Sequence, residues 1–257
     1  MNREMGKVQI LNVQLDNYTK EEVLSRYYEG LFINPNVDGI VRNHYNCQFH
    51  EAVKKASMVI CDSKILGLCS KLLPHPVKEV IPGSSFFSDF YFYHKDNPEI
   101  RIFLLGGKEG VAEKAQKLIN QKVGRDIVVG TYSPPFGFEK DVDETTRIIR
   151  IVDKSNATVV MTGISDPKQT IWLADNKNKF QTAKMFMALG ATIDFEAGNV
   201  KRAPQIFQQL ALEWAYRLYS DPKRLFKRYF VDDIKFFWLF GKQLLGLYKD
   251  SFRNSKP

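Results

Sequence analysis

The sequence lacks several features that would define a protein class at once. It has no apolar run of about 18 residues, the length that a membrane-spanning helix requires. Met1 to Glu4 lead into polar sequence, so no signal peptide is expected. Its three cysteines, Cys47, Cys61 and Cys69, are an odd number without metal-ligand spacing, which fits a reducing cytoplasm. A G-x-G-x-x-G fingerprint is also absent, which disfavours a nicotinamide-dependent oxidoreductase.

Positive charge is present in excess, but it is unevenly spread. The 257 residues carry a formal net charge of +8. Residues 198–257 contain twelve lysines and arginines against five aspartates and glutamates, so the first 197 residues are nearly neutral. This localised charge predicts an anionic partner for the C-terminal region. Nucleic acid is disfavoured as that partner, because the basic residues belong to no recognisable binding module.

Short apolar runs alternate with helical patterns over most of the chain. This alternation predicts an α/β fold, with a Rossmann-like, mainly parallel sheet and helices on both faces. We expect a catalytic domain over residues 1–195 and a basic, aromatic helical appendage over residues 196–257. The strands are expected at residues 8–15, 38–41, 58–61, 101–107, 127–130, 158–163 and 184–189.

Several residues that can carry chemistry follow the expected strands. Asp62 comes after residues 58–61, where it is either a helix N-cap or a base at the ligand-binding edge of the sheet. Arg42 and His44 are expected in a loop after the strand at 38–41, and His44 is either a second base or a structural histidine. Gly106 and Gly107 form a strand-to-helix turn, which lets backbone amides approach a phosphate or serves turn geometry alone.

The last helical pattern combines aromatic residues with lysines. Such a helix suits the headgroup layer of an anionic membrane. The alternative is an amphipathic helix that packs on its own domain or on another subunit. Its apolar face comprises Phe237, Phe240, Leu244 and Tyr248, with Trp238 and Leu245 beside it, and Lys235, Lys242 and Lys249 form a second stripe.

The chain resembles the bacterial WecG/TagA/CpsF glycosyltransferases, glycosyltransferase family 26. Any one of the matching motifs would be weak evidence, but their joint order over residues 8–230 is specific. The motifs are Cys61-Asp62-Ser63, Ile81-Pro82-Gly83-Ser84, Phe103-Leu104-Leu105-Gly106-Gly107, Pro167-Lys168-Gln169, Gly190-Ala191-Thr192-Ile193-Asp194-Phe195, Ala197-Gly198, Lys201-Arg202-Ala203-Pro204, Glu213-Trp214, Tyr216-Arg217, Pro222 and Arg224.

The resemblance implies an inverting transfer of a sugar from a UDP-sugar to a polyprenyl-diphosphate-linked acceptor. Such enzymes build cell-surface polysaccharides at the cytoplasmic face of the membrane, as peripheral proteins. The family's proposed base falls on Asp62, and Gln169 and Asp194 join Gly106 and Gly107 as candidates for nucleotide-sugar binding. The candidates for the acceptor or the diphosphate are Arg42, Arg202, Arg217 and Arg224.

The chain also departs from the family pattern in three places. The family usually has Thr-x-Asn where Arg42-Asn43-His44 is expected to line the floor near Asp62. Ser63 replaces a glycine, and Thr170 replaces the acid of Pro-x-Gln-Glu while Gln169 remains. These changes bear on the sugar or the acceptor more than on the reaction. They also leave a second hypothesis open, a non-catalytic sugar-nucleotide-binding or scaffolding subunit of a polysaccharide assembly complex.

No metal or other cofactor is expected. Asp141-Val142-Asp143 spells the DxD of metal-dependent transferases, but helix-forming residues follow it, so it is interpreted as a solvated helix start. The expected partners are the UDP-sugar, the lipid-linked acceptor and an anionic membrane surface. The sequence does not identify the sugar or the acceptor, and it leaves a homo-oligomer open.

Overall fold

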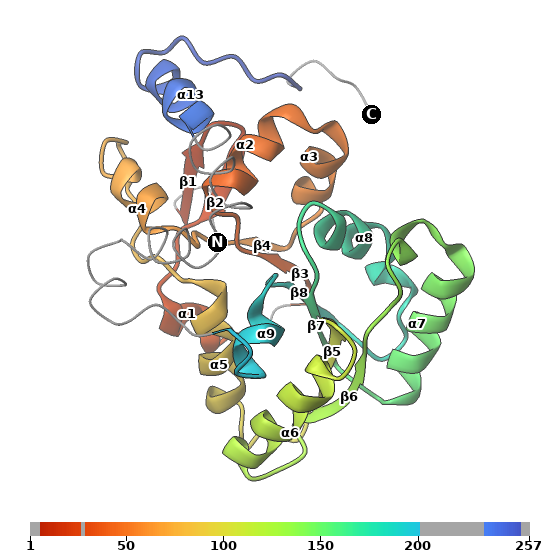
Figure 1. Cartoon of the computed structure of the whole chain (residues 1–257). Coiled ribbons are helices and arrows are strands. Elements are labelled where there is room, and N and C mark those ends of the chain that lie inside the picture. The colour runs from red at the N-terminus through yellow and green to blue at the C-terminus, as the bar shows by residue number, and fades with distance from the viewer. Residues whose placement is uncertain (1–5, 27–28, 201–233, 253–257) are drawn as a thin grey trace.

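The computed structural model describes residues 6–26, 29–200 and 234–252. Its centre is a six-stranded, fully parallel sheet in the order β4-β3-β8-β7-β5-β6, accompanied by an antiparallel hairpin, β1-β2 (Figure 1). The strands are β1 (Lys7–Ile10), β2 (Val13–Asp16), β3 (Gly30–Ile33), β4 (Met58–Val59), β5 (Ile102–Gly106), β6 (Val128–Tyr132), β7 (Val159–Gly163) and β8 (Met185–Ala188). The α/β fold with a parallel sheet is therefore confirmed.

Helices cover both faces of this sheet. They are α1 (Lys20–Leu24), α2 (Val37–Tyr45), α3 (Cys47–Lys54), α4 (Lys64–Ser70), α5 (Gly83–Tyr93), α6 (Val111–Val123), α7 (Val142–Lys154), α8 (Lys168–Asn176), α9 (Thr192–Glu196) and α13 (Ile234–Leu244), with short 3-10 turns η2 (Phe138–Lys140) and η3 (Lys177–Lys179).

The alternating side chains of β5 show which helices share a face. Ile102 and Leu104 pack in one hydrophobic cluster with residues of α5, α6 and α9. Phe103 and Leu105 point to the opposite face and pack with residues of α2, α3, α7 and α8. Each face of the sheet thus has its own core, as expected for strands that are buried on both sides.

Two of the expected elements are wrong in detail. The expected strand at 8–15 is a hairpin, because Leu11 adopts a positive φ of 51° and the chain reverses there. The expected strand at 38–41 is part of α2, which begins after Asn36, whose side chain accepts a hydrogen bond from the Gly39 amide at 3.1 Å. The strand that the sequence analysis missed is β3, which ends at Ile33, a few residues before α2 begins.

The C-terminal helix α13 packs on the first part of the chain. Phe236, Leu239 and Phe240 are buried in the same core cluster as residues of α2 and of the hairpin, and Figure 1 shows α13 beside α2 and β1. Phe240 therefore belongs to the packed face, whereas Phe237 and Trp238 are 52% and 67% exposed. The helix has two apolar faces, and within the described residues one of them is packed on the domain while the other carries the exposed Phe237 and Trp238.

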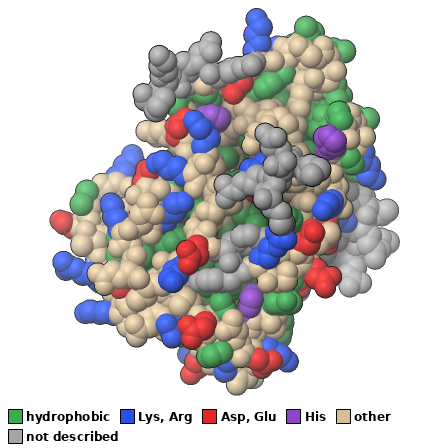
Figure 2. Space-filling model, turned by 180° about the vertical axis from the view of Figure 1, so that it is seen from behind, with side chains coloured by type: hydrophobic (Ala, Val, Ile, Leu, Met, Phe, Trp, Pro, Cys, Tyr) green, Lys and Arg blue, Asp and Glu red, His purple; other side chains and the backbone are tan. Residues whose placement is uncertain are grey.

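Charges of both signs are mixed on one face of the described surface (Figure 2). Figure 2 shows basic and acidic side chains interspersed on the face seen from behind. Over residues 6–26, 29–200 and 234–252, every helix is too short or too polar to cross a bilayer.

Candidate active site

The carboxyl ends of the parallel strands form one edge of the sheet, which we call the carboxyl edge. Open α/β sheets bind ligands at this edge, where neighbouring strands lead to helices on opposite faces. Here β5 leads to α6 on one face, and its neighbour β7 leads to α8 on the other. The two connections also run in opposite directions across the sheet, from β5 to β6 and from β7 to β8. The switch point therefore lies between β5 and β7.

Asp62 lies on the carboxyl edge, just beyond β4, and its carboxylate is held by two other segments. Its Oδ1 accepts hydrogen bonds from Asn34 Nδ2 at 3.1 Å and from the Gly83 amide at 2.8 Å. Gly83 is the first residue of α5, and Ser63, the N-cap of α4, makes no side-chain capping bond. Through the Gly83 amide, Asp62 therefore supports the start of α5. Its role as the base stays a prediction.

Asn34 is the residue that the sequence analysis missed. It follows β3 as Asp62 follows the neighbouring strand β4, and it contributes a side chain directly to Asp62. A Cβ added to Gly83 would lie 2.1 Å from Asn34 Nδ2, so the glycine is required for this close approach. The signal that could have found it is the apolar run Leu31-Phe32-Ile33, which ends just before Asn34.

Gly106 and Gly107 stand at the end of β5, beside the switch point. Gly106 has a φ of +120°, and a Cβ there would lie 2.9 Å from the carbonyl group of Gly163 on β7. The Gly107 amide donates to that same carbonyl at 3.3 Å. Close packing of β5 against β7 thus explains Gly106, whereas Gly107 has a φ of +77° that favours glycine, and α6 begins a few residues later, after Gly110. Phosphate binding at this turn stays a prediction.

Gln169 is buried in the first turn of α8 and joins two loops of the carboxyl edge. Its Oε1 accepts from the amides of Ile164 and Gly190, both at 3.3 Å. The Thr162 hydroxyl donates to the same oxygen at 3.4 Å. Gln169 thereby fixes the segments after β7 and β8 relative to each other. This contact supports a role in shaping the site.

Asp194 lies in α9, which follows the β8 loop. Its backbone carbonyl accepts from the amides of Asn199 at 3.0 Å and Val200 at 3.4 Å, so its main chain helps to end the helix. Its side chain is half-buried. The expected boundary between residues 195 and 196 falls inside α9, whose last residue is Glu196.

His44 lies in the last turn of α2, not in a loop after a strand. Its Nδ1 is 2.9 Å from the Tyr248 hydroxyl, and its Nε2 is 3.2 Å from the Ser251 hydroxyl. Burial lowers the pKa of His44, with the charge of Asp250 opposing the effect. Two hydrogen bonds to Asp62 come from Asn34 and Gly83, and the expectation that residues 42–44 line the floor beside Asp62 stays a prediction. The role of His44 as a second base stays a prediction.

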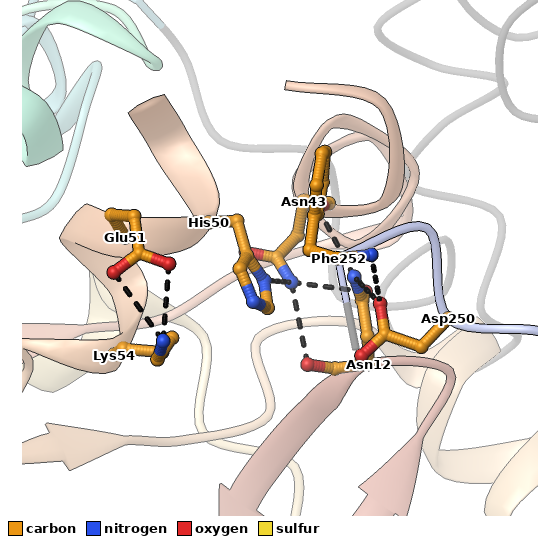
Figure 3. A network of polar contacts seen from close by, with 7 residues as sticks. All are labelled: Asn12, Asn43, His50, Glu51, Lys54, Asp250 and Phe252. Carbon is orange, nitrogen blue, oxygen red and sulfur yellow. Dashed lines mark hydrogen bonds and ion pairs between the residues drawn. The ribbon is translucent and has the colours of Figure 1, made fainter. Parts of the chain in front are cut away.

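The partners of His44 belong to a larger structure, residues 234–252, which we call the C-terminal anchor. Figure 3 shows polar contacts where this anchor meets the rest of the chain. There Asn43 Nδ2 donates to Asn12 Oδ1 at 3.0 Å and lies 3.1 Å from His50 Nδ1. Asn12 Nδ2 in turn donates to Asp250 Oδ1 at 3.1 Å. The rings of His50 and Phe252 lie 5.0 Å apart.

Gln243 attaches the same anchor to the hairpin. Its Oε1 accepts from the Leu11 amide at 2.8 Å, and its Nε2 donates to the Gln9 carbonyl at 2.9 Å. The end of the described chain is therefore fixed to its beginning by hydrogen bonds as well as by apolar packing.

The predicted arginines fall into two groups. Arg42 is on α2, where its guanidinium pairs with Asp38 at 3.1 Å. Burial raises the pKa of Asp166, and the charge of Arg42 opposes that effect. Arg202, Arg217 and Arg224 lie outside the described residues. The arginine contribution to the acceptor or diphosphate site stays a prediction.

Asp141 is a helix cap, as the sequence indicated. Its carboxylate accepts from the amides of Asp143 at 2.9 Å and Glu144 at 3.0 Å at the start of α7. Within the described part of the chain, histidine, cysteine and acidic side chains form no group of three or more that could hold a metal ion.

The chain was compared with known proteins. The family model described as the glycosyl transferase WecG/TagA/CpsF family matches residues 8–250. Similar curated proteins include the N-acetylglucosaminyldiphosphoundecaprenol N-acetyl-beta-D-mannosaminyltransferases of Staphylococcus aureus strains MRSA252 and MW2. Each is 28% identical over 231 residues, which cover 86% of this chain and 87% of the relative. The matched region includes the carboxyl edge and nearly all of the C-terminal anchor, and the chain belongs to the WecG/TagA/CpsF family of glycosyltransferases.

Proposed function

We propose that this glycosyltransferase moves an N-acetylhexosamine from its UDP-activated form to a saccharide linked to polyprenyl diphosphate. The observation that carries the proposal is the placement of Asp62 at the carboxyl edge, with its carboxylate oriented by Asn34 and Gly83. The name of the similar Staphylococcus aureus enzymes, which pairs an N-acetylmannosaminyl donor group with an N-acetylglucosaminyl-diphosphoundecaprenol acceptor, supports this substrate class.

The proposed reaction inverts the anomeric carbon. The acceptor hydroxyl attacks that carbon as the bond to the UDP oxygen breaks, and Asp62 takes the hydroxyl proton. UDP leaves with the electron pair of the broken bond. A carboxylate with an ordinary pKa is adequate for this step when the hydroxyl is held in line, and two hydrogen bonds to one oxygen give Asp62 a fixed orientation.

The test is UDP release from a panel of UDP-sugars that includes UDP-N-acetylmannosamine and UDP-N-acetylglucosamine. The acceptor is a short-chain polyprenyl diphosphate carrying N-acetylglucosamine, and reactions without acceptor serve as controls. Acceptor-dependent release with one donor supports the proposal. Tight UDP binding without release from any donor would instead favour the non-catalytic subunit.

We further propose that the enzyme works at the cytoplasmic face of the membrane, held there through the outer face of α13. Phe237, Trp238 and Leu245 are exposed on or just beyond this helix, and Lys242 Nζ lies 4.8 Å from the centre of the Trp238 ring. A basic residue near anionic lipid contributes about 1 kcal/mol to binding. Because the opposite face of α13 is packed on the domain, membrane contact here would place the whole protein on the surface.

Co-sedimentation with vesicles containing about one-third phosphatidylglycerol tests this membrane contact. We expect Trp238→Ala combined with Lys242→Glu to lower binding at least tenfold. Lys154→Glu, the same charge change at the end of α7, is the matched control and should lower it less. Equal losses in the two variants would contradict the assignment to α13.

A further inference from the structure

Asp166 is a carboxyl group on the carboxyl edge to which the reaction described above assigns no role. It lies in the loop between β7 and α8, two residues before the helix begins. Because β7 borders the switch point with β5, this loop flanks the place where a ligand is expected. Arg42, whose charge reaches Asp166, is already paired with Asp38 at 3.1 Å.

The Asp166 carboxyl is fixed by its neighbours in α8. Thr170 Oγ1 donates to Oδ1 at 2.6 Å. The neighbouring Gln169 side chain favours the charged carboxylate and so opposes the raising of the Asp166 pKa by burial. Since the Gln169 oxygen already accepts from Thr162, Ile164 and Gly190, its amide is held in a single orientation. A side chain so positioned does not need to be ordered when a ligand arrives.

The surroundings of Asp166 disfavour the charged form of its carboxyl group. Burial raises the pKa of Asp166, and the hydrogen bonds and the nearby Arg42 only oppose that effect. Perturbed carboxyls of this kind concentrate at functional sites. Asp166 also precedes α8 by two residues and binds Thr170 in its first turn, so support for the start of α8 is the structural role that any test must separate.

The order of the strands indicates which part of the donor Asp166 would meet. Asp62 follows β4, and the glycine turn that suits the diphosphate follows β5. In the sheet, β3, β8 and β7 lie between these two strands. The sugar is bonded directly to the diphosphate, and β7 is the neighbour of β5 on the side that leads to β4. A donor with its diphosphate at the β5 turn and its sugar directed toward Asp62 would therefore place that sugar at the end of β7.

We propose that Asp166 is a specificity-determining residue of the donor site, where its carboxyl group accepts a hydrogen bond from a hydroxyl or amide N–H of the UDP-linked N-acetylhexosamine. This assignment rests on the proposed function. It also suggests a role for Thr170, which stands at a position where the family usually has an acidic residue. Here the Thr170 hydroxyl holds the carboxyl of Asp166, so a carboxyl is retained one helical turn away.

The test compares the binding of UDP-N-acetylhexosamine with that of UDP by titration calorimetry. Asp166→Asn keeps an acceptor for the Thr170 bonds, since asparagine caps helices as well as aspartate does. We expect it to raise the Kd of the UDP-sugar about tenfold, and Asp166→Ala about 10- to 100-fold, the range for a hydrogen bond to a charged group. The Kd of UDP should stay within about twofold in both variants.

Asp153→Asn is the matched control. Like Asp166, Asp153 accepts from a threonine hydroxyl, with Thr182 Oγ1 3.3 Å from its Oδ1. It also accepts from the Gln181 and Thr182 amides. Asp153 lies at the end of α7, and these partners lie just before β8. The control variant should leave both Kd values unchanged. Parallel weakening of UDP and UDP-sugar by Asp166→Asn would overturn the assignment in favour of a structural role, and so would unchanged binding of both. Wild-type protein that binds no uridine nucleotide would overturn the proposed function itself.

Discussion

The carboxyl edge and the contacts of the C-terminal anchor use the same kinds of polar side chains, but they lie at different places in the fold. At the edge, Asn34 orients the carboxylate of Asp62 over a separation of 28 residues. In the anchor, His44 meets Tyr248 over a separation of 204 residues. The edge lies where strands end and the backbone leaves the sheet, whereas the anchor covers helices that are already packed. The two predicted bases, Asp62 and His44, therefore differ in their position in the topology as well as in residue type.

The largest expected effect tests this difference directly on the two predicted bases. Asp62→Asn removes the proposed proton acceptor, so we expect kcat to fall about 10²- to 10⁴-fold, the usual contribution of a general base. His44→Gln keeps hydrogen-bonding groups at the anchor and should change kcat less than about threefold. The measurement is acceptor-dependent UDP release at saturating donor. A large loss in His44→Gln with a small one in Asp62→Asn would reverse the assignment.

A second comparison uses one amino acid in both regions. Asn34→Ala removes a hydrogen bond from the Asp62 carboxylate, so kcat should fall about tenfold while the free energy of unfolding changes little. Asn43→Ala removes a fully buried amide and leaves Asn12 and His50 without its contacts. It should lower the free energy of unfolding by about 1–3 kcal/mol with kcat nearly unchanged.

Urea denaturation and initial rates on the same two preparations provide the readout. Each variant serves as the control of the other, because the side chain removed is identical. If both variants lost activity and stability in the same proportion, the two regions would form one cooperative unit and the distinction drawn above would fail.

Much of the carboxyl edge was predictable from the sequence because its signals are local. A buried strand reveals itself as a short apolar run, and the residue after the run marks the edge, which is how Asp62, Gly106 and Gly107 were identified. Gln169, which follows β7, was identified through the family motif Pro167-Lys168-Gln169.

The failures occurred where a local signal was ambiguous or the partner was distant. Residues 38–41 have β-branched and apolar character, but the Asn36 cap and the packing of α2 make them helical. Asn34 was missed because the short strand before it, β3, was not predicted. The link of His44 to Tyr248 and Ser251 has no signature in the sequence, since it depends on how the end of the chain returns to the hairpin.

Acidification should affect the two regions with opposite signs. Burial lowers the pKa values of His44 and His50 from 6.5, so the folded anchor favours neutral rings. Below about pH 6.5 the unfolded chain binds more protons, and stability falls as the pH decreases. The pKa of Asp166 is raised from 3.8, so its contribution to stability is present at low pH and is lost as the pH rises through the raised value.

Thermal unfolding between pH 7.5 and 5.5 measures the histidine effect. We expect the melting temperature to fall with the pH, and to fall less in the His44→Gln/His50→Gln double variant. Hydrogen exchange should locate the loosening in residues 234–252. Acid loosening confined to the carboxyl edge would contradict this account.

The smallest expected effect concerns the ion pair at the margin of the anchor. Lys54 Nζ lies 3.0 Å from Glu51 Oε1, with the two side chains 58% and 44% exposed, so solvent screens the pair (Figure 3). Lys54→Ala should change the free energy of unfolding by at most about 0.5 kcal/mol. The positive charge of Lys54 nevertheless helps to lower the pKa of His50, whereas Glu51 and Asp250 oppose it.

Removal of Lys54 should therefore move the pKa of His50 upward, toward its ordinary value, while the anchor stays intact. An NMR titration of the His50 ring protons would measure that shift, and Glu51→Gln should shift them in the opposite direction. Because desolvation is the largest influence on His50, both shifts should be small beside the lowering that burial causes. A Lys54→Ala variant that undocked the C-terminal anchor at neutral pH would show that surface charge, rather than buried hydrogen bonds and apolar packing, holds the end of the chain in place.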